Sequence, residues 1–135
     1  MHLFAYGTLM PANLEAAERD GWWADAVRGR LYDFGPYPAL IDLDHPDAGW
    51  VHGFVHPVSL RELEEKLDPW EEVDRGLYRR VETMTRSGCR AWVYVYQGPW
   101  PALARGPADR WEGTRRAPIS LILPDRDPRK NRHNP

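Results

Sequence analysis

The chain has 135 residues, which is room for one domain with a real hydrophobic core. Its formal charge is −2 and its acidic and basic residues are interspersed, which argues against nucleic acid or an anionic lipid surface as a partner. The single cysteine excludes an internal disulfide, and neither a basic leader nor 18 consecutive apolar residues occur, so we expect a cytoplasmic protein with no membrane partner.

In chain order, the sequence predicts a strand, a short helix and several further strands. Residues 2–6 are typical of a strand that ends at Gly7, and residues 11–19 are typical of a short helix. A hairpin is predicted around Ser87-Gly88, and both faces of its second strand are apolar enough to be covered. The further predicted strands are 27–34, 50–56, 78–85 and 90–96.

The clearest helix begins at Ser59, which stands three residues before Glu62 in the spacing of a capping box. Val58 and Leu63 have the spacing of a hydrophobic staple at the same helix start. Apolar residues then recur at helical intervals, which predicts a buried stripe formed by Leu60, Leu63, Leu67 and Trp70.

Pro69 predicts a kink or a restart of this helix near Asp68, because a proline in a helix interior has no N–H to donate and its ring clashes with the preceding turn. Glu71 follows four residues after Leu67, so helical geometry directs its carboxylate to the apolar side and Glu72 elsewhere. A carboxylate that loses hydration is a stronger base, as a general base requires. The alternative is an ordinary surface acid in an acidic stretch, and the helix alone favours that alternative.

The N-terminal Tyr6-Gly7-Thr8-Leu9 is a second candidate for chemistry. A strand that ends in a glycine turn before a helix presents successive backbone N–H groups, which can hold a carboxylate or a developing oxyanion. The motif is weak on its own, since many such turns contain Gly-Thr. His52 and His56 are four apart on a predicted strand, too far apart to share a metal ion, so we expect no metal site.

The N-terminal motif and the blocks that follow it resemble the gamma-glutamylcyclotransferase-like family, of the AIG2-like type. The resemblance begins at Phe4-Ala5-Tyr6-Gly7-Thr8-Leu9 and extends to about residue 96. Each block is short, and their combination in this order is specific. The later blocks are Gly29-Arg30-Leu31-Tyr32, Tyr37-Pro38-Ala39-Leu40, Val51-His52-Gly53-Phe54-Val55, Leu67-Asp68-Pro69-Trp70-Glu71, Leu77-Tyr78-Arg79-Arg80 and Ala91-Trp92-Val93-Tyr94.

The resemblance implies an α+β fold, a small mixed β-barrel with flanking short helices, over residues 1–123. It also implies a cofactor-independent acyltransferase or lyase that cyclises a γ-glutamyl amine or amino acid to 5-oxoproline and releases the amine. Glu71 is then the catalytic acid/base, and Tyr6, Gly7, Thr8 and Leu9 bind the substrate. Tyr37 and Tyr78 could line the same pocket, although aromatic residues in a Trp-rich core serve more often in packing, and Tyr78 is kept as a further candidate for substrate binding.

Other interpretations stay open at this stage. The chain could be a non-catalytic module that binds a small molecule on the same scaffold, or it could catalyse another amide or acyl transfer. The sequence does not decide the leaving amine or the oligomeric state. Residues 124–135 are polar and contain three prolines, which predicts a disordered tail.

Overall fold

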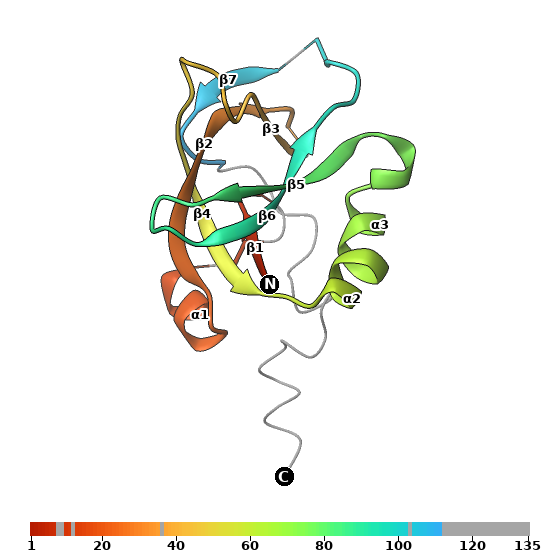
Figure 1. The fold of residues 1–135 in the computed structure, drawn as a ribbon. Helices are drawn as coiled ribbons and strands as arrows, with labels where there is room; N and C mark the ends of the chain where they lie inside the picture. Colours follow the sequence, from red (N-terminus) through yellow and green to blue (C-terminus); the bar gives the residue numbers. More distant parts are fainter. Residues whose placement is uncertain (8–9, 12, 36, 103, 112–135) are drawn as a thin grey trace.

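The computed structural model describes residues 1–7, 10–11, 13–35, 37–102 and 104–111, so the predicted tail and the predicted binding residues Thr8 and Leu9 lie outside it. The described part of the chain forms one curled, mixed sheet, a half-barrel with a few short helices beside it (Figure 1). This is the α+β architecture that the sequence predicted. In chain order the elements are β1 His2–Ala5, α1 Leu14–Arg19, β2 Trp23–Asp33, β3 Pro38–Ile41, β4 Gly49–Pro57, α2 Leu60–Glu62, η1 Leu63–Leu67, α3 Asp68–Trp70, η2 Val73–Arg75, β5 Tyr78–Met84, β6 Arg90–Tyr96 and β7 Arg105–Ala108.

The first strand lies in the middle of the sheet, whose order is β3-β2-β4-β1-β6-β5. β1 pairs antiparallel with β4 and parallel with β6, so both of its edges are occupied by strands much later in the chain. The long strand β2 pairs with β4 over its first half and with β3 and β7 over its second half. The predicted hairpin is confirmed: β5 and β6 pair from Tyr78↔Tyr96 to Met84↔Arg90.

Two buried clusters lie on opposite faces of this sheet. Because side chains alternate along a strand, Phe4 belongs to one cluster and its neighbours Leu3 and Ala5 to the other. The strand β6 alternates in the same way, with Val93 on the side of Phe4 and Tyr94 on the side of Leu3. Both faces of β6 are therefore covered, as predicted.

The helix beside the sheet begins as the sequence predicted. The Ser59 hydroxyl oxygen accepts from the Glu62 backbone N–H at 3.0 Å, and the Glu62 carboxylate accepts from the Ser59 N–H at 2.9 Å, which completes the capping box. Val58 and Leu63 are both buried. Leu60, however, is 45% exposed, so its place in the predicted stripe is wrong. The wider turn η1 follows Leu60, and positions before and after such a turn do not share one regular helical face.

The predicted kink or restart near Asp68 is confirmed: a π-helical turn ends at Leu67, and a new α-helical segment, α3, begins at Asp68 with Pro69 in its first turn. The backbone N–H of Asp68 bonds to the carbonyl of Leu63, five residues earlier, and the N–H of Glu71 bonds to the carbonyl of Leu67 at 2.9 Å. The chain thus takes a π-helical turn just before the proline and remains helical to Trp70. A wide turn accommodates a residue that has no N–H to donate, and the helix continues at the cost of local geometry.

Two element starts differ from the predictions by several residues, and two short strands were not predicted. The first helix begins at Leu14 and not at residue 11, because Asn13 caps it by accepting from the Ala16 N–H at 2.8 Å. β2 begins at Trp23, four residues early. The strands β3 and β7 were not predicted, since each has only four residues, contains a proline and exists by pairing with β2. No helix within the described ranges is long and apolar enough to cross a membrane.

The turn between β5 and β6 is tied to β2 by Asp25. Its carboxylate accepts from the Ser87 hydroxyl, from the Ser87 N–H at 3.1 Å and from the Ala26 N–H at 2.9 Å. Burial by itself would raise the pKa of Asp25, but the hydrogen bonds from Ser87, Thr85 and Ala26 outweigh it and hold the pKa below its usual 3.8. The carboxylate therefore stabilises the fold only while it is ionised.

Asp25→Asn is accordingly expected to lower the free energy of unfolding by about 1 kcal/mol at pH 7, a modest value because the site is partly open to solvent. A lowered folded-state pKa gives stability that is complete above the unfolded pKa and is lost as the pH falls through the folded one. Wild type should therefore lose more stability than the variant between about pH 5 and pH 2. Urea unfolding of both proteins across this range checks the expectation, and parallel pH profiles would contradict it.

The backbones of β1 and β4 approach so closely at Gly53 that a side chain has no space there. A Cβ atom at Gly53 would lie 2.3 Å from the Ala5 carbonyl oxygen and 2.7 Å from the Phe4 ring. Gly53→Ala is therefore expected to cost about 2 kcal/mol or more of unfolding free energy. Gly49→Ala, on the same strand with nothing within 4 Å of the new methyl, is the matched control for denaturant unfolding. Equal losses in the two variants would contradict the steric explanation.

Candidate active site

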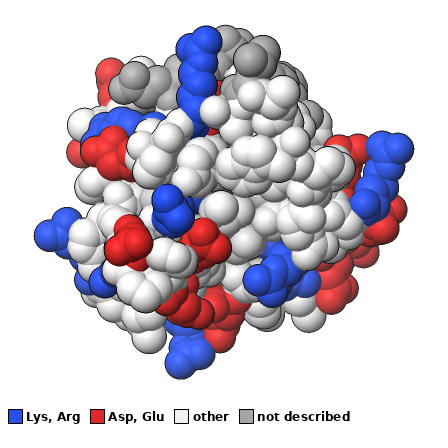
Figure 2. Space-filling view, turned by 90° about the horizontal axis from the view of Figure 1, so that it is seen from above, with Lys and Arg blue, Asp and Glu red and all other residues white. Residues whose placement is uncertain are grey.

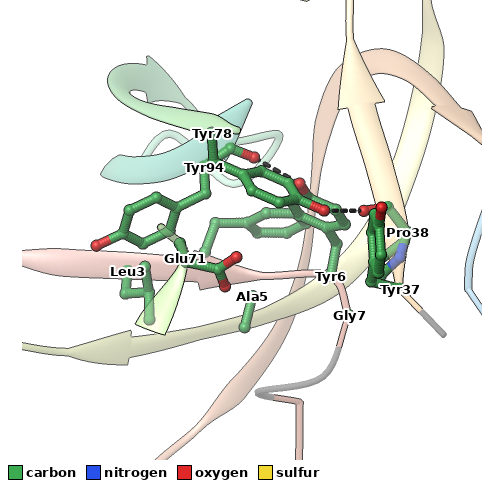
Figure 3. Close-up of a pocket in the computed structure, with 10 residues that line it drawn as sticks. Leu3, Ala5, Tyr6, Gly7, Tyr37, Pro38, Glu71, Tyr78 and Tyr94 are labelled. Atoms are coloured by element: carbon green, nitrogen blue, oxygen red, sulfur yellow. Dashed lines mark hydrogen bonds between the residues drawn. The ribbon is translucent and has the colours of Figure 1, made fainter. Parts of the chain in front are cut away.

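A pocket lies beside the end of β1, between the sheet and the end of α3 (Figure 3). Its walls are apolar and phenolic, and they come from five separate parts of the chain. The curled sheet brings β1, β3, β5 and β6 to this point, and the helical segment supplies the remaining wall. The described residues that line the pocket are Leu3, Phe4, Ala5, Tyr6, Gly7, Tyr37, Pro38, Glu71, Tyr78 and Tyr94.

The end of α3 determines which of two adjacent glutamates faces the pocket. Glu71 is the C-cap residue, and its carboxylate points into the pocket towards Ala5 (Figure 3). Glu72 has a left-handed backbone, with φ of 53°, so the chain changes direction after Glu71. The Glu72 carboxylate accepts from Arg75 at 2.8 Å. The two glutamates therefore have different surroundings, and the one selected by helical spacing is the one in the pocket.

Tyr6 forms part of the pocket wall with its hydroxyl committed to the fold. The Tyr6 hydroxyl donates to the backbone carbonyl of Tyr94, so the last residue before the glycine turn is fixed to β6. Burial, followed by the proximity of Tyr78 and of the Glu71 carboxylate, raises the pKa of Tyr6 well above its usual value. Tyr6 is therefore neutral at physiological pH.

Gly7 and Pro38 form the opposite end of the pocket, where a proline ring lies against a glycine. A Cβ atom at Gly7 would be only 2.4 Å from Pro38 Cγ, so glycine is the residue that permits this approach. Tyr78 fixes the proline from the other side, because its hydroxyl donates to the Pro38 carbonyl at 2.6 Å (Figure 3). The relative position of β1, β3 and β5 at the pocket is thus determined by direct contacts.

A second group of polar side chains anchors the helix that carries Glu71. Asp68 Oδ1 accepts from the Tyr94 hydroxyl at 2.6 Å and from Arg80 Nε at 3.0 Å, and Asp68 Oδ2 accepts from Arg80 Nη2 at 3.3 Å. The Arg80 guanidinium lies 4.6 Å from the centre of the Trp92 ring. Burial, then the hydrogen bond to Asp68 and the charges of Asp68 and Glu71, raise the pKa of Tyr94.

This network connects three elements through short, partly buried contacts. Asp68 stands three residues before Glu71, so Arg80 on β5 and Tyr94 on β6 hold the helix end in register with the sheet. Hydrogen bonds between ionised partners with little exposure are among the stronger ones in proteins. The carboxylate of Glu71 is therefore presented from a rigid support.

The structure brings together Glu71, Tyr6, Gly7 and Tyr78 of the predicted site residues. Sequence reasoning missed Leu3, Phe4, Ala5, Pro38 and Tyr94, and it considered Tyr37 as a possible pocket residue but favoured a packing role for it. The alternation of β1 and β6 could have placed Leu3, Ala5 and Tyr94 on one face, but no local pattern shows that α3 covers that face. Within the described part of the chain, no three His, Cys, Asp or Glu side chains are grouped to hold a metal ion.

Comparison with known families gives a clear match. The model of a family described as gamma-glutamyl cyclotransferase, AIG2-like, covers residues 3–113 of the chain. The chain belongs to this family. The matched span includes the pocket lining, from Leu3 to Tyr94, and the helix end with Glu71. The resemblance seen in the sequence blocks is therefore confirmed at the level of the family.

Curated relatives and a solved structure agree with the AIG2-like family. A Vibrio cholerae protein with the provisional name gamma-glutamylcyclotransferase is 35% identical over 100 residues, which cover 70% of this chain and 81% of that protein. A gamma-glutamylcyclotransferase family protein of Citrobacter rodentium is 30% identical over 119 residues, or 82% of this chain and 95% of that one. The crystal structure of a mouse AIG2-like protein matches with a TM-score of 0.62 at 18% identity, covering 82% of this chain and 87% of that one, which establishes the shared fold.

Proposed function

We propose that this AIG2-like chain is a γ-glutamyl cyclotransferase that converts a γ-glutamyl amine or γ-glutamyl amino acid to 5-oxoproline and releases the amine. The observation that carries the proposal is the position of Glu71 in one pocket with Tyr6 and Gly7, where a carboxylate faces the end of the strand that precedes the glycine turn. Membership of the family supports the reaction class.

The reaction is an intramolecular acyl transfer. The α-amino nitrogen of the γ-glutamyl group attacks the γ-carbonyl carbon, a C–N bond forms to close the five-membered ring, and the bond to the departing nitrogen breaks. Glu71 accepts a proton from the attacking nitrogen and returns one to the departing nitrogen. From the free amine of the substrate to 5-oxoproline and amine, no atom is gained or lost. Because nucleophile and electrophile belong to one molecule, the pocket has only to hold the substrate folded.

We assign the carbonyl oxygen of the substrate to the backbone amides of Gly7, Thr8 and Leu9, of which the structure describes Gly7. Removal of one such donor typically costs about 3 kcal/mol of transition-state stabilisation. The phenol and methyl groups around Glu71 exclude part of the surrounding water, which strengthens interactions with the charge that develops there. Tyr78 and the Pro38 carbonyl form the wall beside this position.

The experiment that tests the proposal is a screen of the purified protein against γ-glutamyl amines and γ-glutamyl dipeptides, with 5-oxoproline release as the readout. We expect at least one compound to be converted, and the best substrate to identify the leaving group. Thermal shifts with the same compounds are measured in parallel. Stabilisation by a γ-glutamyl compound without any product would contradict the enzyme and support a module that only binds.

A further inference from the structure

A row of packed aromatic rings begins with Tyr78 and Tyr37 in the lining of the active-site pocket and passes through the buried Phe34 to Trp100, which is exposed. Ring centres are separated by 6.5 Å from Tyr78 to Tyr37, by 5.8 Å from Tyr37 to Phe34, by 5.0 Å from Phe34 to Trp100, and by 5.0 Å from Trp100 to Tyr32. The successive planes are inclined by 70° to 83°, the edge-to-face arrangement that aromatic rings prefer.

The row extends from the pocket that contains Glu71 towards the protein surface. Tyr78 is buried and lines the pocket, Tyr37 is half-buried and lines the same pocket, and Trp100 at the far part of the row is 52% exposed. Tyr96 packs against the row, with its ring centre 5.2 Å from that of Tyr78 and 4.9 Å from that of Phe34. A group bound beyond the reacting carbonyl, on the side of Tyr37, would therefore meet aromatic faces and edges.

The described lining of the pocket carries one formally charged side chain, that of Glu71, and this charge is negative. Among the described residues, a cation–π contact with this row comes from Arg30, whose guanidinium lies 5.9 Å from the centre of the Tyr32 ring at the outer end. The same guanidinium lies 3.8 Å from the Asp42 carboxylate. On the face seen in Figure 2, acidic and basic side chains are scattered around an area without charged side chains in the described part of the chain. A second carboxylate on the substrate would thus enter the pocket facing Glu71 and phenols.

From this geometry we infer that the leaving amine carries an aromatic or similarly flat apolar group, and that this group binds along the row from Tyr37 to Trp100. The inference rests on the cyclotransferase function proposed above, and it specifies the substrate class. An amine without a carboxylate avoids the charge of Glu71, and a flat ring would replace water on the exposed parts of the Tyr37 and Trp100 rings. The γ-glutamyl part remains the recognised and reacting part.

The test compares four compounds with the wild-type protein by kcat/KM for 5-oxoproline release. γ-Glutamylphenethylamide differs from γ-glutamylethylamide only by the phenyl ring, and from γ-glutamylphenylalanine only by the carboxylate. γ-Glutamyl 4-aminobutylamide adds a distal ammonium group in place of the ring. We expect the phenethylamide to exceed the ethylamide by about tenfold or more, and to exceed both charged compounds as well.

Two variants test whether Trp100 contributes to the preference for the phenyl ring. Trp100→Ala is expected to reduce the phenethylamide-to-ethylamide ratio by about threefold to tenfold, the usual contribution of an aromatic pair. Trp50→Ala is the matched control, because Trp50 is likewise partly exposed, at 38%. Its ring contacts Arg28 and Arg86, which are not part of the aromatic row. This control should leave the ratio unchanged within about twofold.

The outcomes separate the two proposals. Equal conversion of the ethylamide and the phenethylamide would overturn the aromatic subsite while the cyclotransferase function stands. Preference for the phenylalanine or the aminobutyl compound would overturn it in favour of a carboxylate or a cation subsite. Release of 5-oxoproline from none of the compounds in this experiment or in the wider screen would overturn the function, and the subsite with it. The wild-type comparison holds even where a variant fails to fold.

Discussion

Replacement of Glu71 with glutamine is expected to lower kcat/KM for 5-oxoproline release by about a thousandfold, within the range that positioned acid/base groups contribute. Glutamine keeps the size of the side chain and removes its negative charge and its ability to accept and return a proton. The substitution lies at the C-cap of α3, where the backbone N–H continues to bond to the Leu67 carbonyl. The loss should therefore appear in kcat and leave the thermal midpoint within a few degrees of wild type.

The neighbouring glutamate supplies a control within the same turn. Glu72→Gln removes the same charge from the same stretch but on a side chain that accepts from Arg75. It should reduce kcat/KM by no more than about twofold, since an exposed ion pair contributes little. Steady-state kinetics with the best substrate of the screen, together with circular dichroism melts, distinguish the cases. Comparable activity in wild type and Glu71→Gln would remove Glu71 from the chemistry.

The second large effect is expected at Gly7, where alanine should lower kcat/KM by about tenfold to a hundredfold. The new methyl carbon would lie 2.4 Å from Pro38 Cγ, so β1 or β3 has to move at the pocket. A proline ring is rigid, and its carbonyl is held by Tyr78, so the shift is transmitted to residues that face the substrate. Displacements of about 1 Å can cost two orders of magnitude in rate.

Gly49→Ala again serves as the control, because its methyl group meets nothing within 4 Å. Kinetics and melts of both variants separate activity from stability. A fold retained in Gly7→Ala with kcat/KM near the wild-type value would show that the close contact with Pro38 has no part in the site. Loss of activity in Gly49→Ala would point to a general effect of added side chains.

The local features of this fold could be predicted from the sequence because they depend on neighbouring residues. The capping box at Ser59, the hairpin around residues 87–88 and the strand alternation of β6 each rest on spacings of a few positions. Pro69 predicted a kink or restart near Asp68, but a proline does not determine the form that this irregularity takes. The chain could break or widen its helix, and the packing of Leu63 and Leu67 against the sheet favours a helix that continues.

Some residues of the candidate site were predictable from local spacing, and others depend on contacts between distant parts of the chain. Glu71 follows from helical spacing, and its relation to Tyr6-Gly7 was suggested by family resemblance, since 65 positions separate Tyr6 from Glu71 in the chain. Pairings across long separations, such as Arg80 with Asp68 and the Tyr78 hydroxyl with the Pro38 carbonyl, leave no local pattern. These contacts depend on which strands become neighbours, and the short strand β3 that brings Pro38 to the pocket carries almost no signal of its own.

The central position of β1 has a consequence for the order in which the protein assembles. β1 pairs with β4 on one edge and with β6 on the other, so its second edge has no partner until residues 90–96 have been made. Native pairing across such separations closes large loops and is slow. The pocket therefore cannot form early as a local unit, and a chain that ends before β6 would have one edge of β1 open and no Tyr94 to receive the Tyr6 hydroxyl. The pocket is therefore completed only when β6 joins the sheet.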